Sequence, residues 1–265
     1  MAMRHIVSVM VLAGFVSGAP RDYRSEGWAI VRARGSDKDV EVGDLVVFNL
    51  QRPAESRVVG NTGLTDVGSM DFWGDELWAA SFRDDKLSFY TVNVATAQAT
   101  LRSTVEGTFS GVSAGGFDMQ DAYYVVNMRG HNILRVDPWK GTILETLKMP
   151  SSAGYNGVAL IGERFYAARG GTGDPPQEFG TIDLKTGEFT PIGYTNVGVN
   201  GKGGGNGCGA LDYDQAARTL FLVYRQGIEQ GQGWSLYTVD LTTGQATFVD
   251  ELRPKAVYDA FAVRG

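Results

Sequence analysis

The chain has 265 residues, of which 36 are glycine, and 43% of the sequence is hydrophobic. This hydrophobic content is too high for a disordered chain, and the glycine count suits many short strands joined by tight turns. The net charge of −6 gives no general attraction to nucleic acid or to anionic membranes, so neither is expected as a partner.

The first 19 residues have the layout of a secretory signal peptide. Arg4 gives a positive start, an apolar run covers 6–16, and small residues follow at 17–19. The run is too short to span a bilayer. We therefore expect 1–19 to be a signal peptide, 20–26 a linker and 27–265 the mature domain, secreted or periplasmic and without membrane insertion. The alternative is a β-strand over 6–12, and Pro20 is a poor residue directly after a cleavage site.

A turn that begins with Asn or Asp, and has glycine, alanine or proline four positions later, occurs five times. The turns begin 44, 44, 46 and 57 residues apart, at Asn49, Asn93, Asp137, Asp183 and Asp240. An Asx side chain can accept hydrogen bonds from its own turn, and glycine can adopt a positive φ. A period of this size predicts the blades of a β-propeller. Two domains or an open sandwich fit the unbroken repeat less well.

Each repeat predicts four strands, A to D, with the Asx turn joining C to D. For the second to fifth repeats the ranges are 69–73, 76–82, 87–93 and 100–105; 116–120, 122–128, 133–137 and 142–148; 157–161, 164–168, 180–183 and 189–192; and 209–213, 219–224, 235–240 and 246–250. The B strands are apolar throughout, as expected where neighbouring blades cover both faces of a sheet.

The first repeat has a B strand at 28–32 and a C strand at 45–49, but no A strand before them. The last residues, 257–263, resemble the A strand at 69–73 and follow the last D strand. We therefore expect the C-terminal strand to complete the N-terminal blade, which removes free strand edges. The predicted fold is an all-β, five-bladed propeller of four-stranded blades with its ring closed in this way.

Two segments carry a resemblance to known proteins, namely 124–137 (YVVNMRGHNILRVD) and 236–244 (LYTVDLTTG). They resemble the broad class of bacterial YVTN, NHL and quinoprotein-like propellers. The resemblance covers the chain from about residue 27 to its end. It implies blade geometry rather than an activity. The metal-ligand pattern of the lactonase-type propellers is not found, so that activity is not carried over.

Histidine and cysteine are too rare for several kinds of catalysis. His5 lies in the expected signal peptide, so a Ser-His-Asp or Cys-His set would depend on His131 alone. His131 is better interpreted as part of a turn between two strands. Cys208 lies between two glycines and is better interpreted as a small packed residue. One cysteine and one histidine cannot make a closed zinc site.

Carboxylates remain as candidate catalytic groups. Asp71, Asp118 and Asp259 lie at similar places on three A strands, which are the innermost strands of a propeller, so they could approach one another around the axis. Paired carboxyl groups are what glycoside cleavage needs. The alternative is that they accept hydrogen bonds from backbone groups at blade junctions. Ala159 at this place in the fourth repeat favours that alternative.

Acidic residues alternate at Asp37, Asp39 and Glu41, between two glycines, as in some calcium-binding loops. The spacing is not that of an EF-hand loop, so a solvated acidic turn is the preferred interpretation. No other cofactor is expected.

Three long connections lengthen the last two repeats, at 170–179, 195–207 and 226–233. The first and third join B to C and the second joins D to A, so all three are expected on one face of adjacent blades. Long loops on a rigid scaffold are where binding sites are usually built. The alternative is that they are glycine-rich insertions without function, which surfaces tolerate well.

Each B strand ends in or near an arginine, which predicts a ring on this loop-rich face: Arg32 or Arg34, Arg83, Arg129, Arg169 and Arg225. Guanidinium groups bind carboxylate, sulfate or phosphate through paired hydrogen bonds. Lys202, Tyr194 and Trp234 could add charge and a stacking surface. The alternative is that loop acids neutralise each arginine, as Asp84 and Asp85 could do for Arg83.

The sequence as a whole predicts a ligand-binding propeller that recognises a carbohydrate or another polar or anionic small molecule across its last two blades. The first alternative is a carboxylate-dependent hydrolase or lyase, similar to a glycosidase, at the axial funnel. The second is a structural interaction domain of the cell surface.

Overall fold

The computed structural model describes residues 25–33, 40–107, 109, 112–127, 131–149, 154–170, 177–197, 209–225, 233–253 and 256–264. These residues form strands, turns and bends, and no helix. No helix in this part of the chain is therefore long and apolar enough to cross a bilayer.

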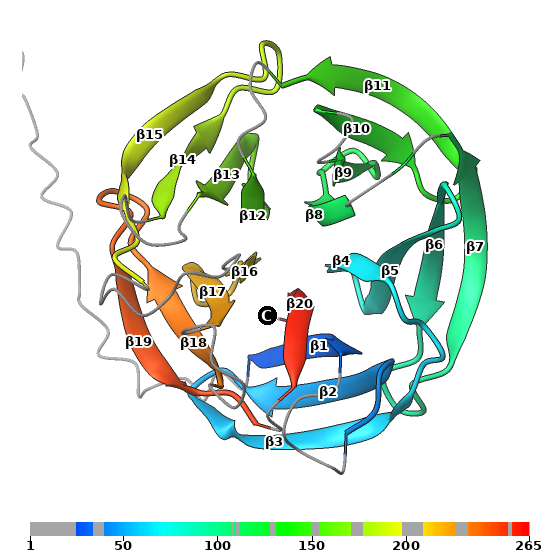
Figure 1. Ribbon diagram of the computed structural model, residues 1–265, viewed down its shortest axis with the longest axis horizontal. Coiled ribbons are helices and arrows are strands. Elements are labelled where there is room, and N and C mark those ends of the chain that lie inside the picture. The colour runs from blue at the N-terminus through cyan, green and yellow to red at the C-terminus, as the bar shows by residue number, and fades with distance from the viewer. Residues whose placement is uncertain are drawn as a thin grey trace, which may run out of the picture.

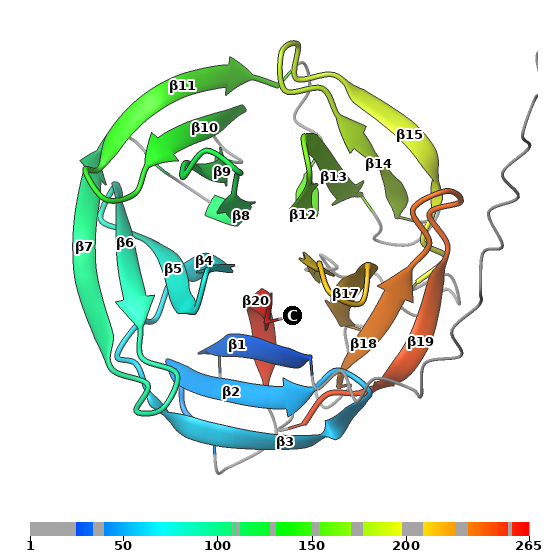
Figure 2. The ribbon, with the colours of Figure 1, turned by 180° about the vertical axis from the view of Figure 1, so that it is seen from behind.

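In the described residues, twenty strands form five antiparallel sheets of four strands each, arranged as blades around one axis (Figures 1 and 2). This confirms the predicted five-bladed propeller. From the axis outwards, blade 1 is β20 (Val257–Arg264), β1 (Glu26–Ala33), β2 (Asp44–Asn49) and β3 (Arg52–Asn61); blade 2 is β4 (Val67–Trp73), β5 (Glu76–Arg83), β6 (Lys86–Val92) and β7 (Ala99–Glu106); blade 3 is β8 (Val112–Phe117), β9 (Tyr123–Asn127), β10 (Asn132–Asp137) and β11 (Thr142–Lys148); blade 4 is β12 (Tyr155–Ile161), β13 (Arg164–Arg169), β14 (Glu178–Ile182) and β15 (Phe189–Tyr194); blade 5 is β16 (Gly209–Asp214), β17 (Thr219–Arg225), β18 (Trp234–Val239) and β19 (Ala246–Glu251).

The ring closes where the C-terminal strand β20 pairs with the N-terminal strand β1 (red beside blue in Figure 1). The register joins Glu26 to Arg264 and Trp28 to Ala262, with irregularities beyond Ile30. This confirms the predicted closure. Both strands gain a paired neighbour instead of an open edge, which would otherwise be a template for aggregation.

Each of the five hydrophobic clusters lies between two neighbouring blades. The cluster between blades 2 and 3, for example, joins Trp78 and Phe89 to Tyr123 and Val125, all four of which are fully buried. Apolar B strands are needed because a blade is covered on both faces. The blades therefore form a stiff scaffold around the axis.

Four of the five predicted Asx turns have the expected geometry. In each, the Asx Oδ1 accepts two backbone N–H groups and the residue four positions on has φ between 61° and 76°; the turns begin at Asn93, Asp137, Asp183 and Asp240. The turn at Asn49 is tighter, since Asn49 pairs directly with Arg52. Its fifth residue is Pro53, whose ring fixes a negative φ and prevents the longer form.

Pairing with the B strands shows which residues of the innermost strands are equivalent. The equivalent residues are Asp71, Gly116, Ala159, Asp212 and Ala262, which pair with the B-strand aromatic residues Trp78, Tyr124, Tyr166, Phe221 and Trp28, respectively. The alignment of Asp118 and Asp259 with Asp71 was therefore wrong. The strand expected at 116–120 is β8, which begins at Val112 and ends at Phe117. A Cβ on Gly116 would lie 3.0 Å from Asp71 Oδ2, so the neighbouring carboxyl group fills the side-chain space there.

Candidate functional site

A cavity of about 420 Å³ lies on the axis, surrounded by the C-terminal ends of the five innermost strands. Asp71 and Asp212 line it together with the aromatic residues that follow them. Met119, in the turn after β8, lies at its edge with 70% of its surface exposed. The volume is in the range of small-molecule sites.

In the part of the chain that the structure describes, the cavity does not continue along the axis as an open channel. Towards the other ends of the innermost strands, Met70, Val158, Leu211 and Phe261 leave a space of only about 10 Å³. This is at or below the room that one water molecule needs. A ligand would therefore enter from the face that carries the A–B turns.

Successive strands of a blade run in opposite directions, so the A–B and C–D turns share one face and the B–C and D–A connections share the other. The cavity consequently opens on the face opposite to the three long connections that the sequence selected. Most of those connections, at 171–176, 198–208 and 226–232, lie outside the described residues.

Asp71 joins two blades through its carboxyl group. The backbone N–H of Phe72 donates to Oδ1 at 2.7 Å, and that of Phe117 on blade 3 donates to Oδ2 at 2.6 Å. The residue is partly exposed and lines the cavity. Burial against the surrounding protein raises the pKa of Asp71 to about 7, although both hydrogen bonds favour the charged form and oppose the shift.

Asp212 makes the equivalent contacts between blades 5 and 1. The backbone N–H of Tyr213 donates to Oδ1 at 2.8 Å, and that of Val263 donates to Oδ2 at 2.6 Å. Burial, followed by the charge of Asp71, raises the pKa of Asp212 well above its usual value. The two carboxyl groups are therefore close enough to interact electrostatically.

Sequence reasoning missed Asp212, although a local signal was present. Asp71 lies in Gly-Ser-Met-Asp-Phe at 68–72, and Asp212 lies in Gly-Ala-Leu-Asp-Tyr at 209–213. Both segments have glycine, a small residue, an apolar residue, aspartate and an aromatic ring in that order. Direct comparison of these segments would have paired the two acids.

An aromatic rim, defined as Trp73, Phe117 and Trp139, lies beside the cavity. The Trp73 ring centroid is 5.1 Å from that of Phe117 and 5.9 Å from that of Trp139. Trp73 and Phe117 line the cavity, and Trp139, in the C–D turn of blade 3, is 40% exposed. Such rings offer flat apolar surface with little conformational entropy to lose.

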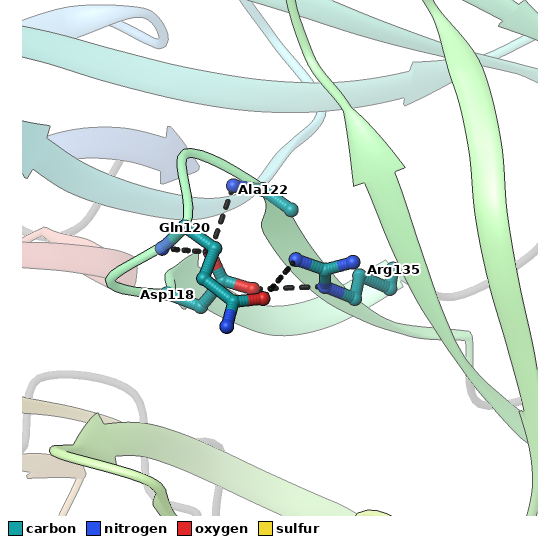
Figure 3. A network of polar contacts seen from close by, with 4 residues as sticks. All are labelled: Asp118, Gln120, Ala122 and Arg135. Atoms are coloured by element: carbon teal, nitrogen blue, oxygen red, sulfur yellow. Dashed lines mark hydrogen bonds and ion pairs between the residues drawn. The ribbon is translucent and has the colours of Figure 1, made fainter.

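Asp118 also lines the cavity, but its carboxyl group is fully engaged (Figure 3). Oδ1 accepts the backbone N–H groups of Gln120 and Ala122, both at 2.8 Å, and Oδ2 accepts Arg135 Nε at 2.8 Å. Arg135 Nη2 also donates to Gln120 Oε1 at 3.0 Å. Asp118 therefore stabilises the β8–β9 turn with its charge compensated.

On the opposite face, Arg169 is held by neighbours within blade 4. Its Nε lies 2.7 Å from Glu178 Oε2, and its guanidinium lies 3.9 Å from the centroid of the Phe189 ring. Arg83 lies 3.8 Å from Asp84, with both side chains exposed. Arg83 and Arg169 therefore each lie beside an acidic residue, as the alternative interpretation of the arginine ring expects.

Arg225 pairs in register with Trp234 and is partly buried. Trp234 itself is only 2% exposed and packs 6.2 Å from Tyr258, so it has no ring face for stacking and its expected role is corrected to a core position. Tyr194, at the end of β15, is 45% exposed.

Most of the remaining candidate binding residues from the sequence lie outside the part of the chain that the structure describes. Arg34, Asp37, Asp39, Arg129, Lys202 and Cys208 lie outside the described residues, as do the side chains of Arg32 and Asp259. Glu41 is exposed and its backbone N–H donates to Asp44 Oδ2 at 2.7 Å. Over the described part of the chain, no group of three or more histidine, cysteine or acidic side chains is arranged to hold a metal ion.

No protein-family model and no curated protein matches the chain. Among solved structures, a chain of a nidogen/laminin complex matches with a TM-score of 0.53 and 10% identity, over 90% of this chain and 98% of that one. A putative 6-phosphogluconolactonase from Bacteroides uniformis matches at 0.47 and 12%, over 88% and 85%. Virginiamycin B lyase from Staphylococcus aureus matches at 0.45 and 13%, over 88% and 73%. At these sequence identities the similarity is one of fold alone. The two TM-scores below 0.5 support no conclusion about function.

Proposed function

We propose that this protein is a ligand-binding β-propeller that takes a small polar molecule, a saccharide or a compound of similar polarity, into the axial cavity. The observation that carries the proposal is the cavity of about 420 Å³, which is lined by two partly exposed aspartates and by aromatic residues. A few polar groups set among apolar surfaces are typical of small-molecule sites.

The carboxyl groups can still accept hydrogen bonds from a ligand. An ionised carboxylate offers about four acceptor positions, and each of these two uses two of them on backbone N–H groups. Hydroxyl or N–H groups of the ligand can take the remaining positions. Trp73 and Phe117 supply flat surfaces for the apolar faces of such a molecule.

The alternative of a carboxylate-dependent hydrolase or lyase is favoured by one observation, the raised pKa values of Asp71 and Asp212. Against it, both oxygens of each carboxyl group hold backbone N–H groups of two blades. A role in binding is compatible with these contacts, whereas a group that donates and regains a proton in each cycle would disturb them. Turnover of glycosides by the protein would restore the alternative.

Export belongs to the proposal as an expectation from the sequence, and calcium binding at 37–41 is the alternative to the preferred solvated acidic turn. A secreted or periplasmic protein would meet free saccharides outside the cell. Residues 1–19 lie outside the described part, and mass spectrometry of the protein secreted by its own host tests whether they are removed. Calcium is tested by repeating the binding measurements with and without it.

The experiment is a glycan and metabolite screen by ligand-observed NMR on three proteins. Ala159→Leu fills the cavity where blade 4 carries no acid, and the double variant Arg169→Ala with Arg225→Ala alters the opposite face. We expect every ligand found with the unmodified protein to be lost with Ala159→Leu and kept with the double variant, at similar melting temperatures. The reverse pattern would place the site on the loop-rich face, and the absence of any ligand would contradict a binding function.

A further inference from the structure

We infer that the axial cavity selects a primary amine of saccharide size, such as an amino sugar, whose ammonium group lies between Asp71 and Asp212. This inference rests on the proposed function and names the class of ligand for the same site.

The first argument is the balance of charge around the cavity. Asp118 is compensated by Arg135 at 2.8 Å, and Arg264 is compensated by Asp75 at 2.6 Å. Of the charged lining residues that the structure describes, this leaves Asp71 and Asp212 without a cationic partner. A ligand that brings one positive charge would supply what the site lacks, whereas an anion would meet two carboxyl groups.

The second argument is the kind of hydrogen bond that the pair can still make. The backbone N–H groups of Phe72, Phe117, Tyr213 and Val263 already donate to the four oxygens at 2.6–2.8 Å. On the ionised carboxyl groups, only acceptor positions remain. An ammonium group has three N–H donors and no acceptor, so it fits this pair better than a hydroxyl group does.

The third argument separates an organic cation from a metal ion. A metal would need further ligands, but the structure describes no suitable group of three acidic, histidine or cysteine side chains. The cavity instead offers the aromatic walls of Phe72, Trp73 and Tyr213. Aromatic faces attract cations and pack well against the carbon skeleton of the ligand.

Small residues stand at the equivalent positions of the other three blades. The equivalent residues on the other three blades are Gly116, Ala159 and Ala262, which are small. Asp71 and Asp212 lie on the two blades that flank blade 1, whose strand β20 contacts both β4 and β16. Both acids line the same cavity, so a ligand nitrogen there can interact with both carboxyl groups.

The protonation of the pair agrees with this arrangement. Burial raises the pKa of both carboxyl groups, so a site without a cation retains protons that a cation would replace. The other titratable or charged groups facing the pair are Asp214, Tyr123, the Asp118–Arg135 pair and the Arg264–Asp75 pair. None of these adds an unpaired positive charge to the described cavity.

The test measures binding of ligands that differ mainly in charge. The probes are glucosamine, N-acetylglucosamine, glucuronate and the trisaccharides of glucosamine and N-acetylglucosamine, measured by titration calorimetry near neutral pH. We expect each amine to bind at least tenfold more tightly than its acetylated counterpart, and glucuronate to show no binding. Asp71→Asn with Asp212→Asn should remove this preference, so that each amine and its acetylated counterpart bind with affinities within about threefold of each other.

The matched control is Asp85→Asn, which removes the same charge from an exposed turn on the opposite face, where φ is 60° and asparagine is tolerated. It should keep the preference for amines, and melting curves check that all variants fold. Equal binding of amines and acetylated forms would overturn the inference and leave the proposed function standing. A preference for amines that survives in the variant with Asp71→Asn and Asp212→Asn would overturn the inference too. Loss of binding of every probe with Ala159→Leu would show that the probes bind in the cavity and not elsewhere.

Discussion

Asp71 and Asp212 each join two blades through their carboxyl group and also line the axial cavity. Each accepts a backbone N–H of its own strand and one of the next blade, and each still lines the cavity. The same burial that makes these contacts strong also raises the pKa, because it disfavours the charged form. The site and the packing of the blades are therefore linked at the level of single residues.

This linkage predicts how stability depends on pH. The pKa of Asp71 is about 7 in the folded protein against 3.8 ordinarily. Between these values the folded protein holds a proton that the unfolded chain has released, so the free energy of unfolding falls as pH rises from about 4 to about 7. The difference corresponds to at most about 4 kcal/mol, and partial access of solvent reduces it.

Asp71→Asn removes this titrating group. Urea unfolding of both proteins at about pH 4.5 and about pH 8 should show a smaller loss of stability with rising pH in the variant. Comparing the two proteins cancels the groups that titrate in both. An identical loss in both would contradict the raised pKa of Asp71.

At the scale of strands and turns, the sequence predicted the regular features well and the site poorly. Asx turns such as that at Asp240 report their own backbone geometry, so they predicted the blades. The surplus strand at 257–263 predicted the closure of the ring. The register of β8 could not be predicted from the turns, because the strand begins at Val112, before its expected start at Gly116. The cavity depends on side chains from five blades that meet only in space, and Asp212 was missed for that reason.

Glycines in the turns give a prediction at this scale. Gly187, in the Asx turn of blade 4, has φ of 72°, and a Cβ there would lie 2.3 Å from the carbonyl oxygen of Lys148 on blade 3. Gly74 has φ of 58° with no atom within 4 Å of its Cβ position. Gly74→Ala should cost about 1–2 kcal/mol through its backbone conformation alone.

Gly187→Ala should cost clearly more than Gly74→Ala, because the contact between blades must also shift. Chemical denaturation of the two variants measures the difference. Equal losses of stability would mean that the Asx turn of blade 4 does not pack closely against blade 3.

At the scale of the molecule, the ring holds the cavity because all five blades contribute to it. Blade 1 combines both ends of the described chain, and its strand β20 contributes Val263 and Arg264 to the cavity. Residues of β20 also pack on both neighbouring blades, with Tyr258 and Phe261 in one cluster and Ala260 and Ala262 in another. Opening the ring would therefore remove the site as well as the closure.

Deletion of 257–265 tests this dependence. Each large buried side chain contributes about 1.5–3 kcal/mol, and a typical domain is stable by only about 5–15 kcal/mol. We expect the truncated protein to melt at a much lower temperature or to fail to fold, whereas deletion of Gly265 alone should have little effect. An unchanged melting temperature after the longer deletion would contradict the role of β20 in closing the ring.

The most direct measurement is NMR of the protein carrying ¹³C-labelled aspartate carboxyl groups, with Asp71→Asn and Asp212→Asn used for assignment. The account predicts that the carboxyl resonances of Asp71 and Asp212 titrate well above pH 4, and that both move when glucosamine is added while that of Asp85 stays in place. Resonances of Asp71 and Asp212 that titrate near the ordinary value of 3.8 and do not respond to glucosamine would contradict it.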